Sequence, residues 1–213
     1  TTGGSNVVVG IYALTANTTG NNNVGVGRSA LGVNTTAIGN TAIGYSSLSL
    51  NTTGAANVAV GYSALYSNTT ANGNTAVGYD ALRANTTGAS NTGIGRYASN
   101  SSTTASNITA VGDQSLYSNT TASNVTAIGK GAMYTNTTGH ESVAIGSNAL
   151  YSNTTGPTNV AIGHSAMFAA TTGGQNVGIG YSSLTANTTG ADNTAIGYRS
   201  LFAVTTGTNN IGL

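Results

Sequence analysis

The feature that most constrains this chain is a glycine that returns every 17 residues, without an insertion or deletion, from Gly10 to Gly197. Each copy of this glycine follows a short stretch of small and apolar residues. A fixed short period is typical of a solenoid, in which each repeat forms one coil and stacks on the next. We number the repeat from Asn57, so that place one is Asn57, place five is Gly61 and place seventeen is Gly73.

Places two to four predict a short β-strand in every coil. Place four is always Ile, Val or Leu, place two is Val, Thr or Ile, and Ala or Gly usually stands between them. Alternation of β-branched residues with a period of two is the pattern of a strand with one buried face. We therefore expect places two and four to point inward. A glycine in every coil argues against a helix.

A second apolar column stands at place nine, where Leu or Met occurs in every coil except at Ser99. With this column inward, a coil buries roughly three apolar side chains, each worth about 1.5–3 kcal/mol. Ordering the residues of one coil costs more, at about 1–2 kcal/mol per residue. A coil therefore cannot fold alone, and its stability must come from stacking. Uncovered strands at the ends of such a stack would pair with further coils or another subunit.

A pair of threonines fills places thirteen and fourteen in every copy, from Thr1 and Thr2 to Thr205 and Thr206. Asn usually precedes the pair, and Gly or Ala always follows it, which fits a turn or a corner between strands. Adjacent residues point to opposite sides, so we expect only one of the two threonine columns to face outward. Threonine hydroxyls can hydrogen-bond along the stack. A regular threonine rank also raises an ice-binding hypothesis, although a corner offers a single rank.

The asparagine before each threonine pair is also an Asn-x-Thr acceptor for N-glycosylation. Such acceptors would line one edge of the stack, and sugars there would keep an uncharged protein soluble. The alternative is that Asn serves only the geometry of the turn. The nine candidate acceptors are Asn17, Asn34, Asn51, Asn68, Asn85, Asn119, Asn136, Asn153 and Asn187.

Aromatic residues recur at places six and ten, and we expect them to form stacked ladders along the coils. A contact with sugars or with a sister chain is the other interpretation of these columns. The candidate contact residues are Tyr45, Tyr62, Tyr66, Tyr79, Tyr117, Tyr134, Tyr151, Tyr181 and Tyr198.

Charged residues make up only 4% of the chain, with five positive and four negative groups. This number is too small for the basic stripe that nucleic-acid binding or an anionic membrane surface needs. The chain contains no cysteine and no apolar run long enough to span a membrane. These features fit an exported protein.

The candidates for acid–base chemistry are few. His140 and Glu141 are adjacent at places sixteen and seventeen, and His164 stands at place six. Neither position has the partners that general acid–base or nucleophilic catalysis requires. The glycines follow the coil period and lack the single lysine-bearing loop that cradles a phosphate. The sequence thus predicts no enzyme, no cofactor and no metal site.

The segments NVAVGYSAL, ESVAIGSNAL and NTAIGYRSL, with Ala64, Ala81 and Ala149 at place eight, resemble the Hep/Hag-type repeats of trimeric autotransporter adhesin heads. The resemblance implies a left-handed parallel β-roll that trimerises and binds host or matrix surfaces. The NTTG portion is an addition to that family's shorter coil. It is similar to repeats in phage tail-fibre and environmental fibre proteins.

We therefore expect an all-β chain, a parallel β-solenoid (β-roll) of about twelve 17-residue coils over residues 1–213, forming one repeat array within a longer fibre protein. The predicted function is a structural extracellular fibre or filament at a cell or virion surface. Its expected partner is itself, as a homotrimer or an end-to-end filament, with glycans as a secondary partner. Two alternatives stay open: an adhesin head or tail-fibre shaft that binds host glycans, and an ice-binding solenoid.

Overall fold

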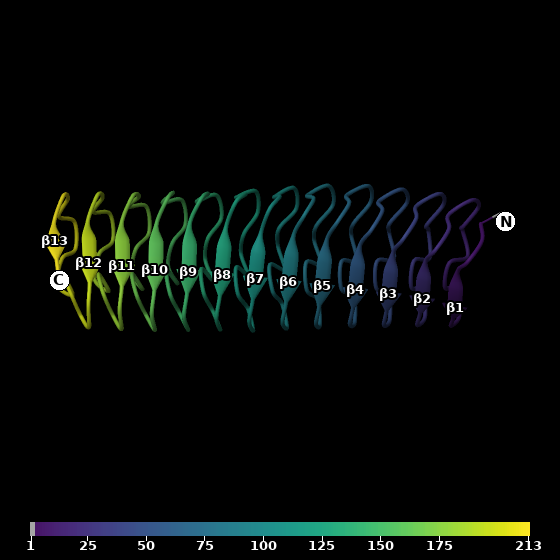
Figure 1. The fold of residues 1–213 in the computed structure, drawn as a ribbon, viewed down its shortest axis with the longest axis horizontal. Coiled ribbons are helices and arrows are strands. Elements are labelled where there is room, and N and C mark those ends of the chain that lie inside the picture. The colour runs from purple at the N-terminus through teal and green to yellow at the C-terminus, as the bar shows by residue number, and fades with distance from the viewer. Residues whose placement is uncertain (1–2) are drawn as a thin grey trace. The chain divides into compact units, whose positions relative to one another are not determined.

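The computed structural model describes residues 3–213, so that Thr1 and Thr2, the first copy of the threonine pair, lie outside the described part. The chain forms two compact units, unit 1 ending at Asn107 and unit 2 beginning at Ile108. Within residues 3–213 each unit consists of short strands, turns and bends, with no helix. Figure 1 shows how each unit is built from stacked coils. The predicted parallel β-solenoid is confirmed.

Each coil contributes one strand, at places two to four. Unit 1 contains β1 (Val7–Val9), β2 (Val24–Val26), β3 (Thr41–Ile43), β4 (Val58–Val60), β5 (Thr75–Val77) and β6 (Thr92–Ile94). Unit 2 contains β7 (Thr109–Val111), β8 (Thr126–Ile128), β9 (Val143–Ile145), β10 (Val160–Ile162), β11 (Val177–Ile179), β12 (Thr194–Ile196) and β13 (Ile211–Gly212).

Neighbouring strands within a unit are parallel, and every residue pairs with the residue 17 places later. Val58 lies opposite Thr75 in unit 1, and Val160 lies opposite Val177 in unit 2. The same register continues outside the strands, where the Leu65 backbone N–H donates at 2.9 Å to the carbonyl of Ala81, the residue before its counterpart Leu82. Each place therefore stacks on its own counterpart around the whole coil.

The strands bury the face opposite to the one expected. The central residue of β4, Ala59, is fully buried, whereas its neighbour Val58 is 36% exposed. In β9, Ala144 is likewise buried, and Ile145 is 37% exposed. Places two and four thus point outward, and the prediction that they form the core is wrong.

The reason is the narrow cross-section of a coil of only 17 residues. The residue at place three lies against the place-nine side chain of the preceding coil. A Cβ added at Gly93 would lie 2.8 Å from Leu82 Cγ, and one added at Gly178 would lie 2.8 Å from Met167 Cγ. Only Ala or Gly fits between the strand and this column. The core therefore consists of small residues at places three and eight, packed on Leu or Met at place nine.

The place-nine column is buried as expected, but its backbone conformation was not anticipated. Leu48 and Leu65 have φ values of 50° and 53°, in the left-handed region that a branched side chain rarely occupies. Places seven and seventeen adopt the same region in each described coil, for example at Ser63 and Ala56. These residues allow the chain to close a coil in so few residues. The threonine pair forms a bend, in agreement with the predicted corner.

We expect alanine substitution to separate the two kinds of glycine in one coil. Gly44, at place five, has a φ of 129°, and an added Cβ would lie 2.7 Å from the Gly61 carbonyl carbon. Gly39, at place seventeen, has nothing within 4 Å of that position, and Ala56 already occupies this place in the next coil. Gly44→Ala should therefore lower the free energy of unfolding by more than about 2 kcal/mol, and Gly39→Ala only by the about 1–2 kcal/mol that the left-handed backbone costs a residue with a Cβ. Denaturant unfolding of both variants measures the difference, and equal losses would contradict the assignment.

Candidate functional surfaces

The asparagine at place twelve lies inside the coil and forms a ladder through the stack. The Nδ2 group of Asn68 donates to Asn51 Oδ1 at 2.8 Å and to the Ala71 carbonyl at 3.1 Å. In unit 2, Asn153 donates in the same way to Asn136 Oδ1 at 2.7 Å and to the Gly156 carbonyl. The amide thus links each coil to the one before it and closes its own turn.

This placement argues against the glycosylation hypothesis. In all nine candidates the asparagine is 5% exposed or less, and its Nδ2 group donates to a backbone carbonyl of its own coil. A sugar on Nδ2 would displace these bonds and would have no space in the folded coil. The alternative, a role in turn geometry, is the one that the structure supports for Asn17, Asn34, Asn51, Asn68, Asn85, Asn119, Asn136, Asn153 and Asn187.

A second asparagine ladder, at place one, was not recognised in the sequence. Asn57 Nδ2 donates to the Ala71 carbonyl at 2.9 Å, so this carbonyl accepts from both asparagines of its coil. Asn57 Oδ1 accepts the backbone N–H of Asn74 in the next coil at 2.9 Å. The available signal was the recurrence of Asn, rather than another small polar residue, at the start of most strands.

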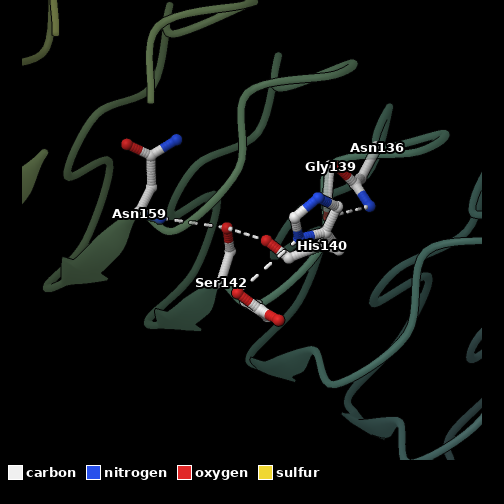
Figure 2. A network of polar contacts seen from close by, with 6 residues as sticks. Asn136, Gly139, His140, Ser142 and Asn159 are labelled. Atoms are coloured by element: carbon white, nitrogen blue, oxygen red, sulfur yellow. Dashed lines mark hydrogen bonds and ion pairs between the residues drawn. The ribbon is translucent and has the colours of Figure 1, made fainter. Parts of the chain in front are cut away.

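Where Ser142 replaces place-one Asn, part of this bonding pattern survives. Ser142 Oγ accepts the backbone N–H of Asn159 at 3.1 Å and donates to the His140 carbonyl at 3.2 Å (Figure 2). Asn136 bonds the Gly139 carbonyl in the same turn. The serine thus keeps the link to the next coil, but its donor bonds a different carbonyl from the one that Asn bonds in other coils.

The place-twelve ladder has interruptions that leave buried oxygens without partners. Ala170 and Ser102 stand where Asn is usual, and the asparagines one coil before them are Asn153 and Asn85. The Oδ1 atoms of both asparagines are buried and make no hydrogen bond. Unpaired buried amide oxygens of this kind destabilise a fold by about 1–3 kcal/mol each.

We predict that Ala170→Asn raises the free energy of unfolding by about 1–2 kcal/mol, because the new Nδ2 group would donate to Asn153 Oδ1. Asn136→Ala is the matched opposite, since it removes the donor to Asn119 Oδ1 and recreates the interruption. We expect it to lower the stability by about 1–3 kcal/mol. Chemical denaturation reports both values. A neutral Ala170→Asn together with a neutral Asn136→Ala would show that the ladder contributes little.

The two threonine columns have different environments, as the sequence predicts. Thr52 Oγ1, at place thirteen, is part-buried and donates to the Thr69 carbonyl at 3.0 Å, and this contact repeats along both units. Thr53, at place fourteen, is exposed. The corner therefore presents a single outward rank of threonine hydroxyls. A single rank adds no support to the ice-binding hypothesis.

The aromatic columns are stacked ladders within each unit. In unit 1, the Tyr62 ring lies 5.0 Å from Tyr45 and 5.1 Å from Tyr79, with interplanar angles of 7° and 8°. Rings stacked in this way turn their edges to solvent, so sugars cannot stack on the inner members. The unit 2 columns are Tyr117–Tyr134–Tyr151–Phe168 at place ten and His164–Tyr181–Tyr198 at place six. The remaining candidate, Tyr66, lies beneath the Arg83 guanidinium at 5.5 Å.

Two shallow grooves of unit 2 are lined by rings of the place-ten column. The first has a volume of about 450 Å³ and is lined by Phe168, Tyr181, Tyr198, Arg199 and Phe202 with nearby hydroxyls. The Arg199 guanidinium lies 3.9 Å from the centre of the Phe202 ring and covers it. The second, of about 370 Å³, places Lys130 and Gln114 beside Tyr134 and Tyr151. Both grooves offer hydrogen-bonding groups and ring edges.

The candidate acid–base residues are surface groups. His140 Nδ1 lies 3.8 Å from Glu141 Oε2, and both side chains are more than half exposed (Figure 2). His164 belongs to the place-six ladder of unit 2. In the described residues, no group of three or more His, Cys, Asp or Glu side chains could hold a metal ion. Residues 3–213 also contain no helix long and apolar enough to cross a membrane.

Asp80 is a carboxylate whose pKa is shifted by its surroundings. Burial raises the pKa of Asp80, and Arg83, whose Nε lies 3.4 Å from Asp80 Oδ1, lowers it in part. That Oδ1 atom is buried and makes no hydrogen bond. Place seven is Ser in several other coils, for example at Ser63, with the same left-handed backbone.

We predict that Asp80→Ser stabilises the chain at neutral pH. Because the folded-state pKa of Asp80 is raised, its contribution to stability is complete below the unfolded pKa of about 3.9 and is lost as pH rises through the folded value. The advantage of the variant should therefore shrink as pH falls towards about 4. Thermal unfolding at neutral and acidic pH tests this, with Asp192→Ser, at an exposed place, as the control. A constant advantage at both pH values would exclude the ionisation of Asp80 as its cause.

The outward face of the strands is an apolar surface without charge. We call the side chains at places two and four of each strand the sheet face. All of them are Val, Ile or Thr in β1 to β12. At place four, Ile43 and Ile94 are 40% exposed and Ile196 is 44% exposed.

No family model, curated protein or solved structure matches the chain. The resemblance to adhesin-head and tail-fibre repeats therefore stays a prediction from the sequence, and function is argued from the molecule itself.

Proposed function

We propose that this chain is part of a structural extracellular fibre, a stiff and self-associating stack of coils whose secondary role is attachment through its surface. The observation that supports this best is the register of 17 residues within each unit. It links successive coils through backbone, asparagine and threonine hydrogen bonds at the same time. Bending or separating two coils would require breaking several of these ladders together.

Composition supports the same function. Each coil consists of a strand, a turn and a bend, which leaves few residues for long flexible loops. Charged residues make up only 4% of the chain. A chain of this kind offers proteases few extended segments. The absence of cysteine fits export but gives no disulfide to stabilise the fibre, so that role falls to the ladders.

Electron microscopy of the purified chain, combined with sedimentation velocity, tests the proposal. We expect elongated particles that associate as concentration rises. Discrete compact monomers at every concentration would contradict a fibre. Trimers would favour an adhesin head or a tail-fibre shaft, and indefinite filaments would favour a structural fibril. The Gly44→Ala chain is the control, because a particle that depends on coil stacking should be disrupted by it.

A further inference from the structure

We propose that the sheet face is the surface through which two copies of this chain associate, face to face and with their coils running in the same direction. The inference rests on the proposed function, since it names the surface used in self-association. It depends on two features of the structure, the apolar strands and the arrangement of charges beside them.

The sheet face resembles half of a β-sandwich interface. Its Val, Ile and Thr side chains stand on a sheet whose other side is already filled by Ala and Leu. In a β-sandwich such faces pack about 10 Å apart with interdigitating side chains. The regular parallel register gives every coil of a unit the same outward pair, so the sheet face of that unit can interdigitate with the same face of a second copy.

Charges lie at the edges of the sheet face in unit 2 and differ in sign between the two edges. The edge before the strands, at place seventeen, carries Glu141 and Asp192. The edge after the strands, at places six and seven, carries Lys130, Arg199 and Asp113. The Arg199 guanidinium covers the Phe202 ring, and Lys130 lies beside Tyr134 and Tyr151. The corresponding edge after the strands in unit 1 carries Arg28 and Arg96 together with Asp80, which lies beside Arg83, and place seventeen there is neutral.

This asymmetry selects the direction of pairing. If the two-fold axis is parallel to the direction of stacking, the edge before the strands of one copy lies over the edge after the strands of the other. Acidic groups of unit 2 then face basic groups. If the axis is instead parallel to the strands, like edges meet and cations oppose cations. Complementary charges across an interface favour the first arrangement and disfavour the second.

The size of the face predicts how tightly two copies associate. Seven strands of three residues or fewer in unit 2 cover on the order of 300–350 Å², taking strand spacings of about 4.8 Å and a rise of about 3.3 Å per residue. A stable standard interface needs about 800 Å² on each partner. A single unit therefore contributes a weak contact, and association should strengthen as more coils take part.

The test is the self-association of the full chain measured by sedimentation velocity over a range of concentrations. Ile128→Lys combined with Ile145→Lys places two charges on the sheet face of unit 2, where each residue is 37% exposed. The matched control, Thr138→Lys combined with Thr155→Lys, places the same charges in the same coils at exposed corner positions. We expect the sheet-face variant to weaken association more than about tenfold, because each ammonium would be buried without a partner. The corner variant should associate like the original chain.

A second variant tests the direction of pairing. Glu141→Lys with Asp192→Lys makes both edges of unit 2 basic, so we expect weaker association that added salt restores in part. Unchanged association of this variant would overturn the parallel arrangement. Equal association of the sheet-face and corner variants, with thermal unfolding showing both folded, would overturn the sheet face as the interface. A chain that never associates would contradict the self-associating fibre itself, which separates the failure of the two proposals.

Discussion

Hydrogen bonding between successive coils, in a register that pairs each residue with its counterpart one coil later, sets the geometry of each unit. Because the offset is always 17 residues, like stacks on like, and every place in the repeat becomes a column. Each side chain must then pack against, or hydrogen-bond to, the side chain at the same place in the coils before and after it. Asparagine does so because its amide both donates and accepts, as Asn51 and Asn68 show. Stacked tyrosines do so through parallel rings. The stability of the stack is thus a sum of nearest-neighbour terms, as in other repeat proteins.

Closing a coil in so few residues determines what can be inside it. The interior accepts Ala or Gly opposite Leu, and the backbone must turn sharply enough to place residues such as Leu65 in the left-handed region. Each such residue costs about 1–2 kcal/mol relative to an ordinary conformation. Glycine at place nine would relieve this strain but would remove a large apolar side chain from the core of its coil. The repeat keeps Leu there and uses glycine at place five, where the backbone of the next coil leaves no space for Cβ.

The period and the strand positions could be predicted from the sequence because an exact repeat with β-branched residues fixes both. Which face of the strand is buried could not be predicted, because alternation shows that the strand has two different faces without showing which one points inward. Val58 and Ala59 could each be buried in a protein core. The coil is too narrow for the larger side chain, so Ala59 is the residue that is buried. The asparagines illustrate the same limit. In the sequence, Asn68 is compatible with a turn residue, a glycan acceptor or a member of a buried ladder. Its two hydrogen bonds in the structure support the turn and the ladder.

The replacements within the repeat show which columns the fold can interrupt. Ser99 and Ser102 replace Leu and Asn in one coil, and their hydroxyls bond each other at 2.6 Å, so that a polar group in the core gains a partner. Ala170 leaves Asn153 Oδ1 unpaired, yet the backbone and threonine ladders continue past it. All nine charged residues, in contrast, lie at places six, seven, ten and seventeen. Places two and four are as exposed as several of these and yet never carry a charge. Exposure alone would allow charges there, and an uncharged face of Val, Ile and Thr is what the proposed packing against a second copy requires.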